Sequence, residues 1–202
     1  MSELILASAS PRRAKLLRQI GIDFEQMTSR VEKERTDATD PRNLVLMLSK
    51  RKAEDVARKF STGWVLGADT VVVLEERILG KPGSRNSAVE MLRSLSGREH
   101  SVFTGLTLID SGNGRAVSQF EETRVWMRPL SEKDIEEYVA TGEPLGKAGS
   151  YAIQGLGALL VERIAGCYYN VVGLPLVRLF RMMGEIGYPF RWSVCPGAAE
   201  VE

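Results

Sequence analysis

The first twenty residues of the chain have a pattern that leaves few choices of fold. The apolar run Leu4–Ala7 has the length of a buried strand, and small hydroxyl residues follow it. Ser10 and Pro11 then suit the start of a helix, because a serine side chain accepts a free backbone N–H and proline lacks the N–H that would be left over. Apolar residues recur at helical spacing until Gly21. The pattern predicts a strand, a short turn and a helix.

The start of this helix suits an anion. A helix N-terminus carries unbonded N–H groups and the positive end of the helix dipole. Arg12 and Arg13 add two guanidinium groups to the first turn, where basic residues oppose the dipole unless something negative lies nearby. We interpret the segment as a phosphate site. The alternative is that two exposed arginines simply cover a helix end.

The rest of the chain alternates strands and helices at first and then favours hairpins. Expected strands cover residues 24–27, 64–66, 69–74, 78–82, 101–109, 116–127 and 158–164, with an interruption at Gly67 and Ala68. Further helices are expected after Asp40, Ser84, Ser131 and Pro175. This order predicts an α/β fold with a mixed sheet. We expect one domain over residues 1–187, followed by a partly disordered tail at 188–202 that lacks periodicity.

Composition argues against several classes of function. The 27 Lys and Arg residues against 26 Asp and Glu leave a net charge of +1, which gives no overall field for holding nucleic acid. No apolar stretch has the length of a membrane span, and no signal-peptide pattern is present, so we expect a cytoplasmic protein that binds no membrane. Cys167 and Cys195 lack the spacing of a zinc site or a disulfide framework. The only histidine, His100, is interpreted as an ordinary strand or turn residue, with a general base as the alternative.

The remaining polar residues suit phosphoryl chemistry. A polyphosphate needs its negative charges neutralised, and an attacking water must be oriented and deprotonated. Candidates for the first task are Arg12, Arg13, Lys52 and Lys81; Asp69, helped by Glu32, is the candidate for the second, directly or by holding a divalent cation.

Each of these candidates has a plainer interpretation. An aspartate within an apolar run is costly unless it is paired or hydrated, but Asp69 could also be a turn residue. Lys81 could be a surface lysine beside a turn proline, and Glu32 stands in a charged run. At least two of Lys50, Arg51 and Lys52 are expected to be solvated. Gln154 could present its amide to a base edge or lie in a loop without a ligand.

Six motifs in order resemble the Maf family of nucleoside triphosphate pyrophosphatases, from Leu4 to about Ile186. They are Ala7-Ser8-Ala9-Ser10-Pro11-Arg12-Arg13, Gly67-Ala68-Asp69-Thr70, Gly80-Lys81-Pro82, Leu95-Ser96-Gly97-Arg98, Lys147-Ala148-Gly149 and Gly173-Leu174-Pro175. The resemblance implies an elongated, twisted mixed sheet flanked by helices, with two lobes around a nucleotide-binding groove. It also implies cleavage of a nucleoside triphosphate to the monophosphate and pyrophosphate.

The resemblance implies roles for individual residues. Asp69 would accept the proton of the attacking water, and Glu32 and Asp69 would hold Mg²⁺ or Mn²⁺. The substrate would be bound by Ser8, Arg12, Arg13, Lys52, Thr70, Lys81 and Gln154. The family usually has an acidic residue where Lys33 follows Glu32, and often another where Gly146 precedes Lys147.

The segment Tyr151–Gly155 resembles the branch of the family that acts on dTTP and UTP. Arg13, Thr70 and Gln154 occupy the positions that set base preference in that family. A glutamine can satisfy both the O4 acceptor and the N3 donor of thymine or uracil. Three alternatives stay open: hydrolysis of 7-methyl-GTP, clearance of modified pyrimidine nucleotides, and a non-catalytic role in cell division. The resemblance also leaves a homodimer open.

Overall fold

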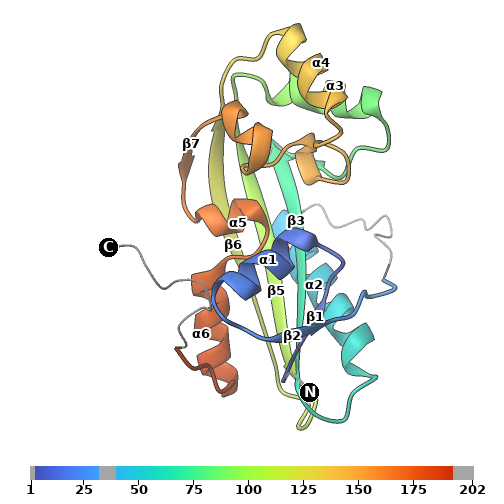
Figure 1. Cartoon of the computed structure of the whole chain (residues 1–202), viewed down its shortest axis with the longest axis vertical. Coiled ribbons are helices and arrows are strands. Elements are labelled where there is room, and N and C mark those ends of the chain that lie inside the picture. The colour runs from blue at the N-terminus through green and yellow to red at the C-terminus, as the bar shows by residue number, and fades with distance from the viewer. Residues whose placement is uncertain (1–2, 32–39, 193–202) are drawn as a thin grey trace.

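Three long antiparallel strands organise the structure, a computed structural model that describes residues 3–31 and 40–192 (Figure 1). Within these ranges the strands form a seven-stranded sheet in the order β2-β1-β3-β5-β6-β7, with β4 also paired to β3. The strands are β1 (Leu4–Ala7), β2 (Phe24–Gln26), β3 (Trp64–Leu74), β4 (Arg77–Leu79), β5 (Glu99–Asp110), β6 (Ala116–Met127) and β7 (Val161–Ala165). β1 runs parallel to β2 and β3, and the other pairs are antiparallel. The predicted mixed α/β sheet is confirmed.

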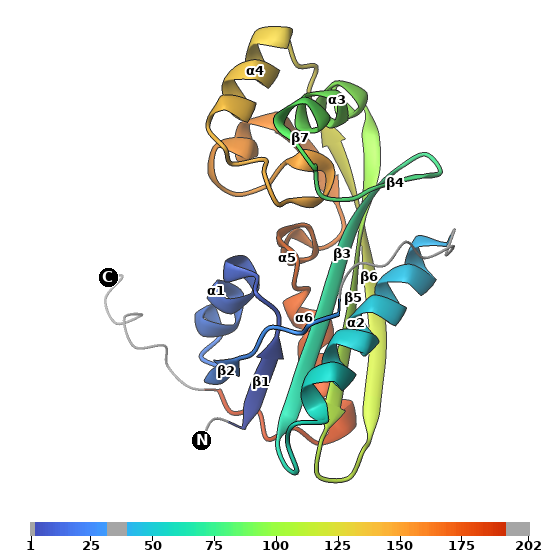
Figure 2. The same cartoon turned by 90° about the vertical axis from the view of Figure 1, so that its right-hand side faces the viewer.

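Helices cover both faces of the sheet. They are α1 (Pro11–Gln19), α2 (Pro41–Ala57), α3 (Arg85–Leu95), α4 (Glu132–Ala140), α5 (Tyr168–Val172) and α6 (Leu176–Ile186), with 3₁₀ segments η1 (Ala148–Ser150) and η2 (Gly155–Leu160). Figure 2 shows α2 on one face and α1, α5 and α6 on the other, while α3 and α4 gather at one end. Separate apolar clusters join α1 and α6 to the sheet and α3 and α4 to its far end. Over the described ranges, none of the helices is both long and apolar enough to span a bilayer.

The predicted helix starts are confirmed by their caps. The side chains of Ser10, Asp40 and Ser84 each accept a backbone N–H at the start of α1, α2 and α3. At the start of α4, Ser131 and Asp134 bond each other's backbone in a capping box. These bonds join residues two or three positions apart, so they depend on local sequence alone.

The expected interruption at Gly67 and Ala68 is wrong, because β3 runs unbroken from Trp64 to Leu74. A Cβ atom on Gly67 would lie 2.2 Å from the carbonyl oxygen of Ser49 in α2, and one on Gly105 would lie 2.2 Å from that of Val45. Both glycines therefore mark a close approach of α2 to the sheet rather than a break in a strand. The last expected strand also begins later, because residues 155–160 form η2 and β7 starts at Val161.

The C-terminal prediction is covered in part. Tyr188 packs edge-on against Trp64, and Phe190 and Trp192 pack with Phe180 of α6. Residues 193–202 lie outside the described residues. The division into a domain at 1–187 and a tail at 188–202 stays a prediction.

One stretch of β3 lies beside a gap in the sheet. β1 pairs with β3 only as far as Ala7 opposite Gly67, and β4 pairs with β3 from Val72 onward. Between them, residues 68–71 pair with β5 on one side and with no strand of the described residues on the other. Side chains from both faces of β3 can therefore reach the space beyond the end of β1.

Candidate active site

A cavity of about 540 Å³ lies at this gap. Its walls come from the β1–α1 turn, residues 28–29, Lys52 of α2, β3, Lys81, and the segments around Lys147, Tyr151 and Val172. The predicted residues Ser8, Arg12, Arg13, Lys52, Asp69, Thr70 and Lys81 all line it. The structure thus brings together side chains that lie up to 73 positions apart in sequence.

One predicted residue does not line the cavity, and another lies outside the described residues. Gln154 immediately precedes η2 and is absent from the described residues that line the cavity. Glu32 lies outside the described residues, so its metal-binding role stays a prediction.

The start of α1 faces the cavity with its cap intact. The Ser10 side chain accepts from the Arg13 N–H at 3.5 Å, and the Ser10 N–H donates to Ser8 Oγ at 3.2 Å. Arg12 is half-buried beside this turn. Burial lowers its pKa, and the nearby Tyr138 and Glu143 oppose that shift. The turn therefore offers a cation and the positive end of a helix to the same space.

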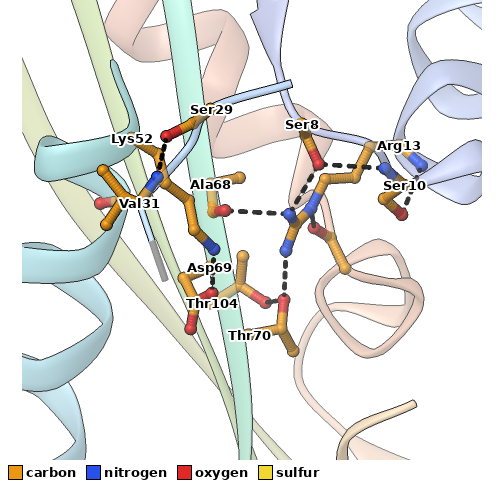
Figure 3. Close-up of polar contacts among 12 residues, drawn as sticks. Ser8, Ser10, Arg13, Ser29, Val31, Lys52, Ala68, Asp69, Thr70 and Thr104 are labelled. Atoms are coloured by element: carbon orange, nitrogen blue, oxygen red, sulfur yellow. Dashed lines mark hydrogen bonds and ion pairs between the residues drawn. The ribbon is translucent and has the colours of Figure 1, made fainter. Parts of the chain in front are cut away.

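Arg13 is buried and tied to three parts of the fold (Figure 3). Its Nε donates to the Gly173 carbonyl at 2.8 Å, and its Nη1 donates to Ser8 Oγ at 3.1 Å and to the Ala68 carbonyl at 2.9 Å. Its Nη2 donates to Thr70 Oγ1 at 3.0 Å. These bonds use four of the five guanidinium N–H donors. Burial lowers the pKa of Arg13 to about 10, so the group stays charged at neutral pH.

Asp69 and Lys52 form an ion pair in the wall of the cavity. Lys52 Nζ pairs with Asp69 Oδ1, and the two side chains are 16% and 4% exposed. Lys50 and Arg51 are exposed, as expected for two of the three basic residues in that run. The interpretation of Asp69 as a turn residue is wrong, because it lies within β3 opposite Gly105. Close approaches of α2 to the sheet at Gly67, beside Ala53, and at Gly105, beside Val45, hold the helix that carries Lys52 against β3 and β5.

Two further lysines, Lys81 and Lys147, line the cavity. Lys81 is exposed and lies two residues beyond β4, so the expected strand over residues 78–82 is wrong at its end, because β4 stops at Leu79. Lys147 donates to the backbone carbonyl of Glu143, and burial and the nearby Arg12 lower its pKa. The sequence motif pointed to Lys147, but no charge pattern gave it a role. Five cations therefore line the cavity within the described residues, and Asp69 is the one carboxylate among them.

Glu143 was not predicted, and it holds the loop that carries Lys147. It accepts from the Tyr138 hydroxyl at 2.9 Å and from the N–H groups of Gly157 and Leu156 at 3.0 and 3.1 Å. Burial alone would raise the pKa of Glu143, yet these bonds outweigh it and lower the pKa. A glutamate before a proline in a glycine-rich stretch gives no signal of such a role in sequence.

His100 is a buried residue of β5, as the favoured interpretation held. Its Nε2 lies 2.7 Å from the Tyr151 hydroxyl, and burial lowers its pKa to about 4. Among the described residues, it is not one that lines the cavity. A neutral, enclosed imidazole does not suit a base that must reach a substrate.

The oxygen ligands in the cavity suit a divalent cation only if the substrate supplies some of them. No group of three or more His, Cys, Asp and Glu side chains able to hold a metal occurs within residues 3–31 and 40–192. In phosphate sites, Mg²⁺ is held by one or two carboxylates together with substrate phosphates, rather than by a cage of protein ligands. Asp69 beside five cations fits that mode.

Comparison with known proteins gives a consistent result. A family described as Maf-like protein matches residues 3–186. The chain is 47% identical over 188 residues to the dTTP/UTP pyrophosphatase of Pelotomaculum thermopropionicum, covering 93% of this chain and 98% of that protein. It is 48% identical over 186 residues to that of Carboxydothermus hydrogenoformans, covering 92% and 100%. The Staphylococcus aureus Ham1 protein matches at a TM-score of 0.44 with 13% identity over 61% of this chain and 71% of that one, too distant to carry an argument.

Proposed function

The chain belongs to the Maf family, and from this premise we propose that it hydrolyses dTTP and UTP to the nucleoside monophosphate and pyrophosphate. Relatives with that name share nearly half of its residues over more than nine tenths of its length. The observation that carries the proposal is the cavity at the gap beside β3, where five cations and a helix N-terminus surround a single carboxylate of the described residues.

The cations suit the triphosphate. Arg12, Lys81 and Lys147 line the cavity, and Arg13 adds a buried positive charge to its wall. Fixed positive groups in a site partly closed to water stabilise the charge that develops on phosphate oxygens during transfer. Because Arg13 is held by four bonds to the protein, its charge is in place before the substrate arrives.

Asp69 suits the role of proton acceptor. Water attacks a phosphorus atom, its oxygen forms the new P–O bond, and the bond that bridges the α- and β-phosphates breaks to release pyrophosphate. The proton of the attacking water passes to the Asp69 carboxylate, which Lys52 holds in position through their ion pair. Lys52 is therefore a positioning residue for this carboxylate.

A divalent cation, Mg²⁺ or Mn²⁺, is part of the proposal. Asp69 would hold it together with phosphate oxygens, and Glu32 is the predicted second ligand. When bound, the ion would neutralise charge on the phosphates. We further propose a cytoplasmic location, where free nucleoside triphosphates occur, and leave the homodimer as a prediction.

A nucleotide panel tests the proposal. Pyrophosphate release is measured from dTTP, UTP, CTP, GTP and 7-methyl-GTP, with and without Mg²⁺, and from pyrimidine triphosphates modified at C5. Turnover is expected to be fastest with dTTP and UTP and to need the cation. Fastest turnover with 7-methyl-GTP, or none with any nucleotide, contradicts the proposal.

The variant Asp69→Asn separates catalysis from binding. Loss of the proton acceptor should lower turnover by at least about 100-fold while dTTP still binds. Asp110→Asn is the matched control, because Asp110 ends β5 and bonds the Gly112 N–H, away from the cavity. Full turnover by Asp69→Asn would remove the catalytic role. Binding without turnover in the wild-type chain would favour a regulator instead.

A further inference from the structure

Two threonines meet behind one wall of the cavity. Thr70 of β3 and Thr104 of β5 are opposite one another, with their Oγ1 atoms 2.9 Å apart. Arg13 Nη2 donates to Thr70 Oγ1 at 3.0 Å (Figure 3). Thr104 Oγ1 donates to the backbone carbonyl of Asn170 at 3.2 Å. Thr70 is half-buried and lines the cavity, whereas Thr104 is fully buried.

These hydrogen bonds form a relay from Arg13 through Thr70 and Thr104 to the Asn170 backbone carbonyl, and the groups at its two ends fix the direction of every bond in it. An arginine N–H only donates, and a carbonyl oxygen only accepts. The single hydroxyl proton of Thr104 is used on the Asn170 carbonyl, so Thr104 must accept from Thr70. The single hydroxyl proton of Thr70 is therefore used on Thr104, and one Thr70 lone pair takes the Arg13 bond. What remains on Thr70 is one lone pair and no proton.

The Asn170 end of this hydrogen-bond relay is held in place. Asn170 of α5 is fully buried, and its Nδ2 donates to the Val102 carbonyl at 2.9 Å and to Thr123 Oγ1 at 3.0 Å. These bonds join α5 to β5 and β6. The backbone carbonyl of Asn170 therefore stays a fixed acceptor for Thr104, and the direction of the hydrogen bonds does not depend on a mobile group.

The wall around Thr70 suits a flat ring. Apolar residues gather on this face of the sheet, where the cavity is lined by Val72, Val102, Tyr151, Val171 and Val172. Asp69 and Lys52 lie on the other face of β3, toward α2. A largely apolar wall with a few fixed polar groups, here Thr70 and the adjacent Arg13, is the usual form of a site that binds an aromatic ring and fixes its orientation.

We propose that Thr104 is a positioning residue that sets base preference. It accepts the hydrogen bond of the Thr70 hydroxyl, which points that proton away from the cavity, so that Thr70 can only accept a hydrogen bond from the substrate. The inference rests on the proposed function and adds a physical cause for its pyrimidine preference. Thymine and uracil carry an N–H at ring position 3, which can donate to Thr70. Cytosine carries an unprotonated nitrogen there, and two lone pairs facing each other cost binding.

Thr104→Val tests this directly, because valine keeps the shape of threonine and removes the hydroxyl. The Thr70 proton is then free to turn toward the cavity. The ratio of kcat/KM for UTP to that for CTP should fall by roughly tenfold, because Thr70 can then donate a hydrogen bond to the unprotonated ring nitrogen of cytosine. Thr104→Ser retains the hydroxyl and should restore the ratio. An unchanged ratio in Thr104→Val, or an equal loss for both nucleotides, overturns the proposal.

Thr107→Val is the matched control. Thr107 is a buried threonine of the same strand, and its Oγ1 bonds Ser49 and Ser118 on the opposite face. It should lose stability without changing the UTP-to-CTP ratio. A change in that ratio as large as the one in Thr104→Val would show that any buried hydroxyl has the effect, and would overturn the proposal.

Two further measurements keep the test independent of folding and of turnover. N3-methyl-UTP offers no N–H, so the wild-type chain should discriminate against it, whereas turnover equal to that of UTP overturns the proposal even if Thr104→Val fails to fold. Calorimetric binding of UTP and CTP in the Asp69→Asn background gives the ratio of the dissociation constant for CTP to that for UTP without catalysis, and Thr104→Val should lower that ratio too. If the chain hydrolyses no nucleotide, the proposed function fails, but a preference for UTP that Thr104→Val abolishes would still support the positioning role.

Discussion

Replacing Gly105 by alanine should move α2 away from the sheet and uncouple Lys52 from Asp69. The added Cβ would lie 2.2 Å from the Val45 carbonyl oxygen, a backbone atom that no side-chain rotation can shift. A carbon–oxygen contact needs about 3.3 Å, so the helix must retreat by about 1 Å at this point. Overpacking of this kind costs about 1–3 kcal/mol of unfolding free energy.

The variant should lose activity as well as stability. Displacement of a positioning group by about 1 Å can lower turnover by about 100-fold, and α2 carries Lys52 to the Asp69 carboxylate. Urea unfolding followed by circular dichroism gives the stability, and steady-state release of pyrophosphate from dTTP gives kcat and KM.

Gly184→Ala is the matched control for Gly105→Ala. Gly184 lies in α6, and nothing lies within 4 Å of an added Cβ. Alanine is favoured over glycine in a helix by about 1 kcal/mol, so this variant should be slightly stabilised and fully active. The reasoning is refuted if the free energy of unfolding of Gly105→Ala lies within about 0.5 kcal/mol of that of the wild-type chain, as for an ordinary surface substitution, and the variant keeps its full kcat.

Three further predictions follow from single side chains. Burial lowers the pKa of His100 to about 4, below the value of about 6.5 in an unfolded chain, so its contribution to stability is complete above pH 6.5 and is lost as pH falls toward 4, by at most about 3 kcal/mol. The imidazole resonance of this single histidine should show no titration between pH 6 and 8, and a midpoint near 6.5 in the folded protein would contradict its burial. Lys81→Ala removes an exposed cation of the cavity, so KM for dTTP should rise and its salt dependence weaken while the urea midpoint stays unchanged; an unchanged KM would place the triphosphate elsewhere. Bonds from Arg128 and Ser131 hold the pKa of Asp134 below its usual range, so stability from this cap is present above the unfolded pKa of about 3.9 and is lost as pH falls further; Asp134→Asn should flatten the acid side of the stability profile, and an unaltered profile would contradict this.

Features set by neighbouring residues could be predicted from the sequence. The caps at Ser10, Ser84 and Ser131 depend on bonds that span three residues, and each predicted helix begins where expected. Arg12, Arg13 and Asp69 were predicted for a related reason, since charged side chains within an apolar strand or in the first turn of α1 are costly without a ligand or a partner, whereas Ser8 and Thr70 were named only through the family resemblance.

Features set by long-range contacts could not be predicted in the same way. Gly67 suggested a break in a strand, whereas its cause is the backbone of α2 at Ser49. The short helix α5 has no side-chain cap, and its Asn170 is held by bonds to Val102 and Thr123 from two distant strands. Gln154 was chosen for its amide chemistry, but the fold places it beside η2, outside the lining of the cavity within the described residues.

The most direct test is a crystal structure of the Asp69→Asn variant soaked with dTTP, in which substrate should survive. The triphosphate should lie against the first turn of α1, contact Arg12 and Lys81, and have its α- or β-phosphate next to position 69. Nucleotide bound on another surface, or a triphosphate turned away from position 69, would contradict this prediction.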